Sequence, residues 1–463
     1  METDRYDLVV IGSGPAGEKA AAQAAYFGKR VAVIERAPEP GGAAVHTGTL
    51  PSKTLRESAI FLSGHRSRAL YGVAVSLEKN VTLQTLMARK RAIAIAESRR
   101  IRDNLRRHGI DLIEGHARFV DPHHLEVAGR RIGADYVLVS TGSRPRRPDG
   151  IAFESPRIHD SDEVLEIETM PSSITILGAG VIGCEYACMF AALGTRVDLV
   201  DGRSEILPFI DEEIRHRLED EMRALGVHFH KEERWGAIED HDTEVSVVLK
   251  DATLRAENLL FAAGRSGNTH DLGLSHAGLE ANKRGYLEVD ECYRTAVPHI
   301  LAAGDVIGFP ALASASMEQG RVAVCRAFGF HYKQEMSGMI PYGIYTIPEV
   351  SAVGLTEQEC REQERPHVVG RARFHDNARG QIQGDLGGMT KLVVCAETRT
   401  LLGVHVIGER ASEMVHLGQI ALLTGATVDL FIEMVFNYPT LSETYKYAAY
   451  ECLGALADRK VDP

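Results

Sequence analysis

Three glycines near the start of the chain, Gly12, Gly14 and Gly17, have the spacing of a dinucleotide-binding fingerprint. The first permits a tight turn, the second lets the backbone approach a pyrophosphate, and the third lets a helix pack closely on a strand. Free N–H groups at the start of that helix would attract the phosphates. Glu35 follows 23 residues after Gly12, and a carboxylate there can accept hydrogen bonds from both ribose hydroxyls. The stretch therefore predicts a dinucleotide site for an adenosine with a free 2′-hydroxyl.

A second glycine-rich stretch repeats the pattern at Gly178, Gly180 and Gly183. The strand after it leads to Asp201, and Arg203 comes two residues later. Asp201 suits a free ribose 2′-hydroxyl, whereas the guanidinium of Arg203 could bind a 2′-phosphate. The pattern predicts a site that accepts either nicotinamide dinucleotide, unless Arg203 simply faces solvent. Two dinucleotide sites in one chain indicate a bound flavin, an exchangeable nicotinamide and hydride transfer between them.

Short apolar strands must position these groups, because ligands of an α/β sheet meet the carboxyl ends of its strands. Thr141 and Gly142 follow one such strand, Gly264 follows another, and Asp305 lies just beyond a third. Strands are expected at residues 6–11, 30–34 and 196–200. Another is expected directly before the second fingerprint, and others within the stretches 136–145, 259–265 and 299–306. The sequence thus predicts an α/β fold.

The chain has 463 residues and a net charge of −12, which argues against a general binder of nucleic acid. In the basic segment from Arg89 to Arg107 the apolar residues recur at helical spacing. We expect an amphipathic helix there, rather than a nucleic-acid or partner surface. No apolar run approaches the roughly 18 residues of a membrane span, and a strand starts the chain without a signal peptide. We therefore expect a cytoplasmic protein that binds neither nucleic acid nor membranes.

The cysteines and histidines do not form a metal or disulfide pattern. The seven cysteines are scattered, and Cys184 and Cys188 lie four residues apart on the second fingerprint helix, where we expect them to pack against the sheet. His228 and His230 would share one face of a strand, but no third ligand follows at a plausible spacing. We expect no metal site.

The two fingerprints and the strand-end stretches, in this order, resemble the flavoprotein disulfide reductase superfamily. The likeness covers essentially the whole chain, including a C-terminal stretch from Ile347 to Glu357. It implies two Rossmann-like domains, which bind FAD and NAD(P), and a C-terminal α+β dimerisation domain. The implied limits are 1–147 and 269–335 for the FAD domain, 148–268 for the NAD(P) domain and 336–463 for the dimerisation domain. A homodimer or larger homo-oligomer is expected.

The resemblance also implies roles for single residues. Lys53 and Glu185 would pair beside the isoalloxazine, with Lys53 near the nitrogen that takes the hydride. The helix that starts near Ala313 would point its positive end at the pyrimidine edge of the flavin. The residues expected at FAD are Gly12, Gly14, Gly17, Glu35, Lys53, Thr141, Gly142, Asp305 and Ala313. Those expected at NAD(P) are Gly178, Gly180, Gly183, Glu185, Asp201, Arg203 and Gly264.

One feature of the superfamily is missing from this chain. Its disulfide reductases carry two cysteines in the loop before the Pro-Ser-Lys segment, where this sequence has Ala44 and Thr49. Near their C-terminus they also carry a histidine that serves as acid and base for the thiols, where this sequence has Tyr438. Neither alanine nor threonine can form the thiolate that exchange chemistry requires. Reduction of lipoamide or glutathione is therefore disfavoured.

Within the superfamily, the chain most resembles the family of soluble, Si-specific NAD(P)+ transhydrogenases. Four stretches carry this likeness: His46–Lys53, Gly264–Thr269, Gly304–Ser314 and Phe436–Thr440. Many members keep a cysteine at the position of Ala44, so this chain departs from the family there.

The implied reaction passes hydride from NADPH to FAD and then to NAD+ at one shared nicotinamide site. Lys53 would favour the anionic reduced flavin, Glu185 would hold Lys53, and Thr49 would fill the space that a thiolate otherwise occupies. One alternative is an NAD(P)H diaphorase that reduces quinones, dyes or oxygen. A second is a non-catalytic flavin-bound scaffold or redox sensor, although such a protein has no need of the nicotinamide features between Gly178 and Glu185.

Overall fold

A computed structural model describes residues 4–64, 83–167 and 169–461 of the chain. Its first sheet has the strand order β3-β2-β1-β6-β5-β4, with β17 paired to β6. The strands are β1 (Asp4–Ile11), β2 (Val31–Glu35), β3 (Asp111–Glu114), β4 (Arg118–Asp121), β5 (His124–Val127), β6 (Arg130–Val139) and β17 (Ile300–Ala302). β3, β2, β1, β6 and β17 are parallel to one another, whereas β5 pairs antiparallel with both β6 and β4. The strand predicted at 30–34 is confirmed, one residue further along.

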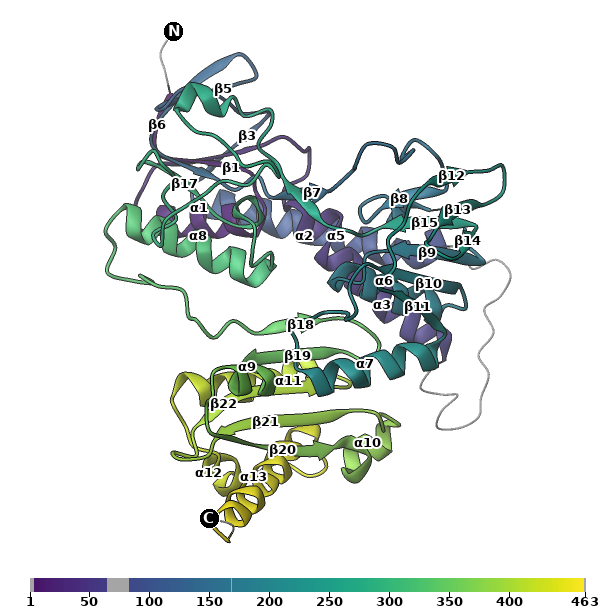
Figure 1. Ribbon diagram of the computed structural model, residues 1–463. Helices are drawn as coiled ribbons and strands as arrows, with labels where there is room; N and C mark the ends of the chain where they lie inside the picture. Colours follow the sequence, from purple (N-terminus) through teal and green to yellow (C-terminus); the bar gives the residue numbers. More distant parts are fainter. Residues whose placement is uncertain (1–3, 65–82, 168, 462–463) are drawn as a thin grey trace.

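Helices pack around this sheet, and Figure 1 shows α1 and α8 side by side against it. The helices of this part are α1 (Pro15–Tyr26), α2 (Gly42–His46), α3 (Thr49–Ser63), α5 (Leu83–Arg107) and α8 (Ala313–Ala327), with short 3₁₀ turns at Leu274–Ala277 and Asp305–Ile307. α5 confirms the helix expected from its apolar spacing. Ser98, Ile101 and Leu105 are buried on one of its faces, as the amphipathic pattern requires.

The second sheet repeats the architecture with the order β11-β10-β9-β15-β8, all parallel. Its strands are β8 (Ile158–Asp160), β9 (Ser173–Leu177), β10 (Arg196–Asp201), β11 (Val227–Lys231) and β15 (Asn258–Phe261). Its helices are α6 (Val181–Ala192) and α7 (Glu212–Leu225), with a 3₁₀ turn at Val164–Glu166; an antiparallel sheet of β12 (Ile238–Asp240), β13 (Val245–Val248) and β14 (Thr253–Ala256) adjoins it. The chain passes from the first sheet to the second and back again. The two connecting segments pair as an antiparallel ribbon of β7 (Ser143–Pro145) and β16 (Arg265–Gly267).

The C-terminal part is an antiparallel sheet with the order β18-β19-β22-β21-β20. Its strands are β18 (Tyr342–Ile344), β19 (Val350–Gly354), β20 (His367–Arg373), β21 (Met389–Cys395) and β22 (Leu401–Ile407). Its helices are α9 (Glu357–Glu362), α10 (Ala378–Gln383), α11 (Ala411–Leu423), α12 (Asp429–Glu433) and α13 (Thr444–Val461), with 3₁₀ turns at Phe374–Asp376 and Leu441–Glu443. The mixed α/β architecture confirms the expected fold class, and the residue limits of the domains stay a prediction.

Two contacts fix how the three parts meet. One apolar core includes Leu55 of α3, Cys188 of α6 and Ile407 of β22, so it reaches into all three. Figure 1 shows α7 lying along the C-terminal sheet. There the ammonium of Lys391, which is 1% exposed, lies 2.9 Å from Asp211 and 2.6 Å from Glu357. Asp211 also caps the start of α7 by accepting a hydrogen bond from the backbone of Glu213.

In the part of the chain that the structure describes, no helix is both long enough and apolar enough to cross a membrane. The described residues also contain no group of three or more histidine, cysteine, aspartate or glutamate side chains placed to hold a metal ion. His230 instead directs its Nε2 to Asp198 at 2.9 Å.

Candidate functional site

The first glycine fingerprint forms the turn that its spacing predicts. Gly12 has a φ of +99°, and a Cβ added to it would lie 2.6 Å from the carbonyl oxygen of Ser140. A Cβ on Gly17 would lie 1.9 Å from the carbonyl oxygen of Gly12, so only glycine allows α1 to pack this closely on β1. A Cβ on Gly14 would meet no atom within 4 Å. Gly14 thus leaves open space at the start of α1, which fits a group that approaches the backbone.

Glu35 is held at the end of β2 by a small hydrogen-bond network. Its Oε2 accepts from the backbone N–H of Ser13 at 2.9 Å and from the Ser13 hydroxyl at 2.6 Å. Its Oε1 accepts from the N–H of Ala37 at 2.9 Å. The carboxylate is buried beside the fingerprint turn. The structure thus joins Glu35 to the turn as the fingerprint predicts.

The groups expected further along the same sheet edge are also in place. Thr141 carries a buried hydroxyl that has no hydrogen-bond partner among the described residues. Asp305 accepts from the Ser143 hydroxyl at 2.9 Å, and Arg265 Nε donates to that hydroxyl at 2.8 Å. α8 begins at Ala313, as predicted, and no side chain caps its start. An orphaned buried hydroxyl, an open glycine turn and uncapped helix starts fit a ligand with phosphates and hydroxyls.

The second fingerprint repeats this geometry. A Cβ on Gly183 would lie 1.8 Å from the carbonyl oxygen of Gly178, whereas a Cβ on Gly180 would meet no atom within 4 Å. Gly180 precedes α6, whose start has no side-chain cap. Gly264 has a φ of +109° and would also leave its Cβ free of contacts. The residues present therefore fit a second dinucleotide.

The structure joins Asp201 and Arg203, whose relation the sequence left open. Arg203 Nε lies 2.9 Å from Asp201 Oδ1, and Arg203 Nη2 lies 2.8 Å from Asp201 Oδ2. Asp201 also accepts from the N–H of Ala179 at 2.6 Å, so it is tied to the fingerprint turn. Burial alone would raise the pKa of Asp201, but the hydrogen bonds from Arg203 hold that pKa below its ordinary value. Arg203 thus bends back onto the acid.

Lys53 and Glu185 meet although they are 132 residues apart in the sequence. The Lys53 ammonium lies 2.7 Å from Glu185 Oε2, with 25% of the lysine and 5% of the glutamate side chain exposed. Gly48 precedes the start of α3, which places Lys53 in its first turns, and Glu185 lies in the first turns of α6. The pair that the resemblance implied is therefore formed.

Tyr345 completes this pair, and the sequence reasoning missed it. Its backbone N–H donates to Glu185 Oε1 at 2.9 Å. The Lys53 ammonium lies 4.7 Å from the centroid of its ring, which is within the range of a cation–π contact. Tyr345 lies just beyond β18, two residues before the C-terminal stretch that carried the resemblance. No local pattern marks it, because its contacts come from distant segments.

Asp162 is a second residue that the sequence did not indicate. It follows β8, lies 3.9 Å from Arg265 Nη1 and forms a side-chain hydrogen bond with Thr47 of the loop before α3. Burial raises its pKa to about 6, although Arg265 lowers it. Asp162 therefore connects the loop that lacks the cysteines to the second sheet.

Asp162→Asn is expected to stabilise the fold above pH 6 by about 1 kcal/mol or more. The native pKa, about 6, lies above the unfolded value of about 3.9. The native state therefore binds more protons between these values, and its stability falls as the pH rises through that window. Urea unfolding at pH 5 and pH 7.5 measures this, and the advantage of the variant should be the greater at pH 7.5. An advantage that does not change with pH would contradict this reading.

The loop before α3 offers no thiol, and no described cysteine replaces one. Thr49 is exposed, Ala44 is half-buried, and Tyr438 is 74% exposed. All seven cysteines are free. Burial raises the pKa of the Cys188 thiol to about 12 and also raises the pKa of Cys184, so both stay protonated at neutral pH. Both cysteines are buried in the apolar core around α6, and Cys188 directs its Sγ to the carbonyl oxygen of Ile347, outside the second sheet, at 3.9 Å.

His46 has a structural contact of its own, with its Nε2 3.2 Å from the carbonyl oxygen of Pro40.

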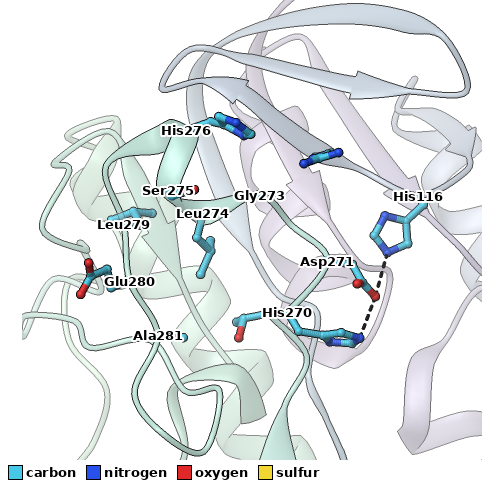
Figure 2. A pocket seen from close by; sticks show the side chains of 12 residues that line it. His116, His270, Asp271, Gly273, Leu274, Ser275, His276, Leu279, Glu280 and Ala281 are labelled. Carbon is cyan, nitrogen blue, oxygen red and sulfur yellow. Dashed lines mark ion pairs between the residues drawn. The ribbon is translucent and has the colours of Figure 1, made fainter.

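A separate cavity of about 920 Å³ opens beside β4 and is lined by residues that include His116, His270 and His276 (Figure 2). Asp271 lies between two of them, 2.7 Å from His270. The residues that line this cavity include none of those predicted for the two cofactors.

Comparison with known proteins agrees with this geometry. The family model described as pyridine nucleotide-disulphide oxidoreductase matches residues 6–320, and the dimerisation-domain model of the same family matches residues 340–449. A soluble pyridine nucleotide transhydrogenase of Mycobacterium tuberculosis is 46% identical over 97% of this chain and 98% of its own length. Another, from Colwellia psychrerythraea, is 42% identical over the same shares.

Solved structures show the same fold. The HOCl-induced flavoprotein disulfide reductase RclA from Escherichia coli aligns with a TM-score of 0.87 at 27% identity, over 96% of this chain and 99% of its own. LpdA from Mycobacterium tuberculosis aligns with a TM-score of 0.85 at 28% identity, over 97% and 99%. This chain therefore belongs to the pyridine nucleotide-disulphide oxidoreductase family, and within it is related to the soluble pyridine nucleotide transhydrogenases.

Proposed function

We propose that this protein catalyses FAD-dependent hydride transfer between NADPH and NAD+, without disulfide chemistry. The observation that carries the proposal is the Lys53–Glu185–Tyr345 cluster beside a loop that has Ala44 and Thr49 instead of thiols. The cluster keeps a cation at the expected flavin, whereas the groups for thiol exchange are absent. The names of the relatives at 41–46% identity support the same activity.

The first sheet would hold FAD through its fingerprint glycines, Glu35, Thr141, Gly142, Asp305 and the start of α8. Bound FAD would supply a two-electron carrier that takes a hydride from one nicotinamide and gives it to another. Lys53 holds a positive charge at a fixed place, because Glu185 and the Tyr345 ring both contact its ammonium. Such a preorganised cation stabilises negative charge where it develops and needs no rearrangement during the reaction. Thr49 fills the position of a thiol without adding a nucleophile.

The second sheet would bind NADP(H) and NAD(H) in turn through Gly178, Gly180, Gly183, Glu185 and Gly264. Asp201 and Arg203 would contact the adenosine ribose end. In this mechanism the protein mainly binds and orients the nicotinamide and flavin rings, because their alignment supplies much of the rate enhancement of a hydride transfer.

The proposal includes the domain limits 1–147 with 269–335, 148–268 and 336–463, and a cytoplasmic homodimer formed through the last of these. The match to a dimerisation-domain model supports the dimer. Large apolar side chains are also exposed on this part: Ile420, Leu423, Val435, Tyr438, Tyr447 and Tyr450.

With NADPH as donor, the purified yellow protein is expected to reduce a thionicotinamide analogue of NAD+ faster than lipoamide or a quinone. The absence of a cysteine pair from the loop before α3 predicts lipoamide turnover at background level. Absorbance of the reduced analogue measures the first rate, and NADPH consumption measures the other two under the same conditions. Fast quinone reduction beside slow transfer to the analogue would overturn the proposal in favour of a diaphorase.

A further inference from the structure

The loop after β11 lies directly beside the strand end that carries Asp201 and Arg203. The backbone N–H of Glu232 donates to the carbonyl of Arg203 at 3.1 Å, and the N–H of Glu233 donates to the carbonyl of Asp201 at 3.1 Å. These two bonds fix the loop next to the acid at which an adenosine ribose is expected.

The first sheet has an equivalent loop. There the N–H of Gly115 donates to the carbonyl of Glu35 at 2.9 Å. Each loop follows the edge strand of its parallel sheet and bonds back to the acid at the end of the neighbouring strand. The loop after β11 is therefore a structural part of its dinucleotide fold, and it lies beside the acid that is expected at the adenosine end.

Arg234 is the cation of this loop. A Cβ on Gly202 would lie 3.7 Å from Cγ of Arg234, so the stem of the arginine passes across the residue between Asp201 and Arg203. The Arg234 side chain is exposed. No carboxylate of the described residues forms an ion pair with its guanidinium.

Two other charges of this segment have partners, whereas Glu232 forms no ion pair with the described residues. Lys231 pairs with Glu219 at 3.1 Å, and Glu233 accepts from the backbone N–H of Lys250 at 3.3 Å. Arg203 is held by both carboxylate oxygens of Asp201. The strand end thus carries one guanidinium that is neutralised and a second, Arg234, that is not.

We propose that Arg234 is a specificity-determining residue that binds the 2′-phosphate of NADP(H) and takes no part in binding NAD(H). This assignment rests on the proposed function of the second sheet. A 2′-phosphate carries up to two negative charges and would be repelled by Asp201, so it needs cations that Asp201 does not neutralise. Arg234 supplies one, and Arg203 supplies a second when it exchanges Asp201 for the phosphate. With NAD(H), Arg203 stays on Asp201, and the ribose hydroxyls donate to the remaining lone pairs of the carboxylate.

The test compares two ligands that lack the nicotinamide, ADP-ribose and 2′-phospho-ADP-ribose, by calorimetry with the flavin-loaded enzyme. Arg234→Ala is expected to weaken binding of the phosphorylated ligand about tenfold, the size of one charge-assisted hydrogen bond to a partly exposed phosphate. The affinity for ADP-ribose should change by less than about twofold, since no part of that ligand needs the second cation. Arg234→Lys should weaken binding of the phosphorylated ligand less than Arg234→Ala does. Lysine keeps the positive charge, although it lacks the planar guanidinium that can donate two parallel hydrogen bonds to a phosphate.

Arg99→Ala is the matched control, because it removes one exposed arginine from α5, in the other part of the molecule. It should change neither affinity, which excludes an effect of net charge alone. Equal losses of both ligands in Arg234→Ala, or no loss of either, would overturn the assignment. If the unaltered enzyme binds neither ligand, the proposed nicotinamide site itself fails, and that outcome is distinct from the failure of Arg234.

Discussion

Lys53→Met is expected to slow hydride transfer from NADPH to the thionicotinamide analogue by about 100-fold. The variant keeps most of the apolar stem but removes the charge that Glu185 and the Tyr345 ring hold in place. Removing a single preorganised electrostatic group from an active site commonly costs about this factor in kcat. The rate at saturating nucleotide measures the effect, and KM should change less, because in the proposed mechanism the lysine acts on the reacting centre.

A matched control is Lys283→Met, which removes an exposed lysine from the chain. It should leave the rate unchanged. The rate of Glu185→Gln should lie between the rates of Lys53→Met and Lys283→Met. A glutamine can still accept a hydrogen bond from the N–H of Tyr345, but it no longer neutralises Lys53. The bound flavin is quantified in every variant from its absorbance. A Lys53→Met enzyme with full flavin content and an undiminished rate would refute the role given to this lysine.

Lys391→Met is expected to destabilise the protein by about 3–5 kcal/mol. The lysine is 1% exposed, and the Asp211 that it contacts is fully buried. Removing one partner of a buried ion pair leaves the other charge without compensation, which is more costly than the net value of the pair. Because Asp211 also caps α7, the loss should loosen the contact between α7 and the C-terminal sheet. Thermal unfolding of the flavin-loaded protein measures the change.

The surface pair Lys250–Asp251 provides the comparison, with both side chains more than 80% exposed. Lys250→Met should cost less than about 1 kcal/mol. The variant Lys391→Met with Asp211→Asn should recover part of the stability, since it removes the uncompensated charge. Equal effects of Lys391→Met and Lys250→Met would contradict the prediction.

The strands next to the two glycine fingerprints could be predicted from the sequence because their causes are local. The positive φ of Gly12 and the close approach of Gly17 to the carbonyl oxygen of Gly12 both arise within a few residues, and apolar runs such as residues 6–11 indicate buried parallel strands. The end of a strand then places an acid such as Glu35 without knowledge of the rest of the fold.

The cluster around Lys53 could not be predicted in this way. Its partner Glu185 came only from resemblance, since nothing local relates α3 to α6. Tyr345 and Asp162 reach the site through tertiary contacts between segments that each look ordinary. For Arg203 the sequence left open a contact with a 2′-phosphate or a side chain that faces solvent, whereas the structure shows an ion pair with the acid two residues earlier. Contacts between sheets, rather than the sheets themselves, were the part that local reasoning could not supply.

The ribbon of β7 and β16 also affects the chain entropy of folding. Val139 of β6 and Ile300 of β17 lie in paired strands but are 161 positions apart. If the second sheet has formed and the ribbon is closed, only about 40 residues remain in the loop between β6 and β17. The loop is then about four times shorter, which means that its length is halved about twice. Each doubling of a flexible loop costs about 0.6 kcal/mol, so the ribbon lowers the cost of adding β17 by roughly 1 kcal/mol. The inserted sheet thereby assists closure of the sheet that it interrupts.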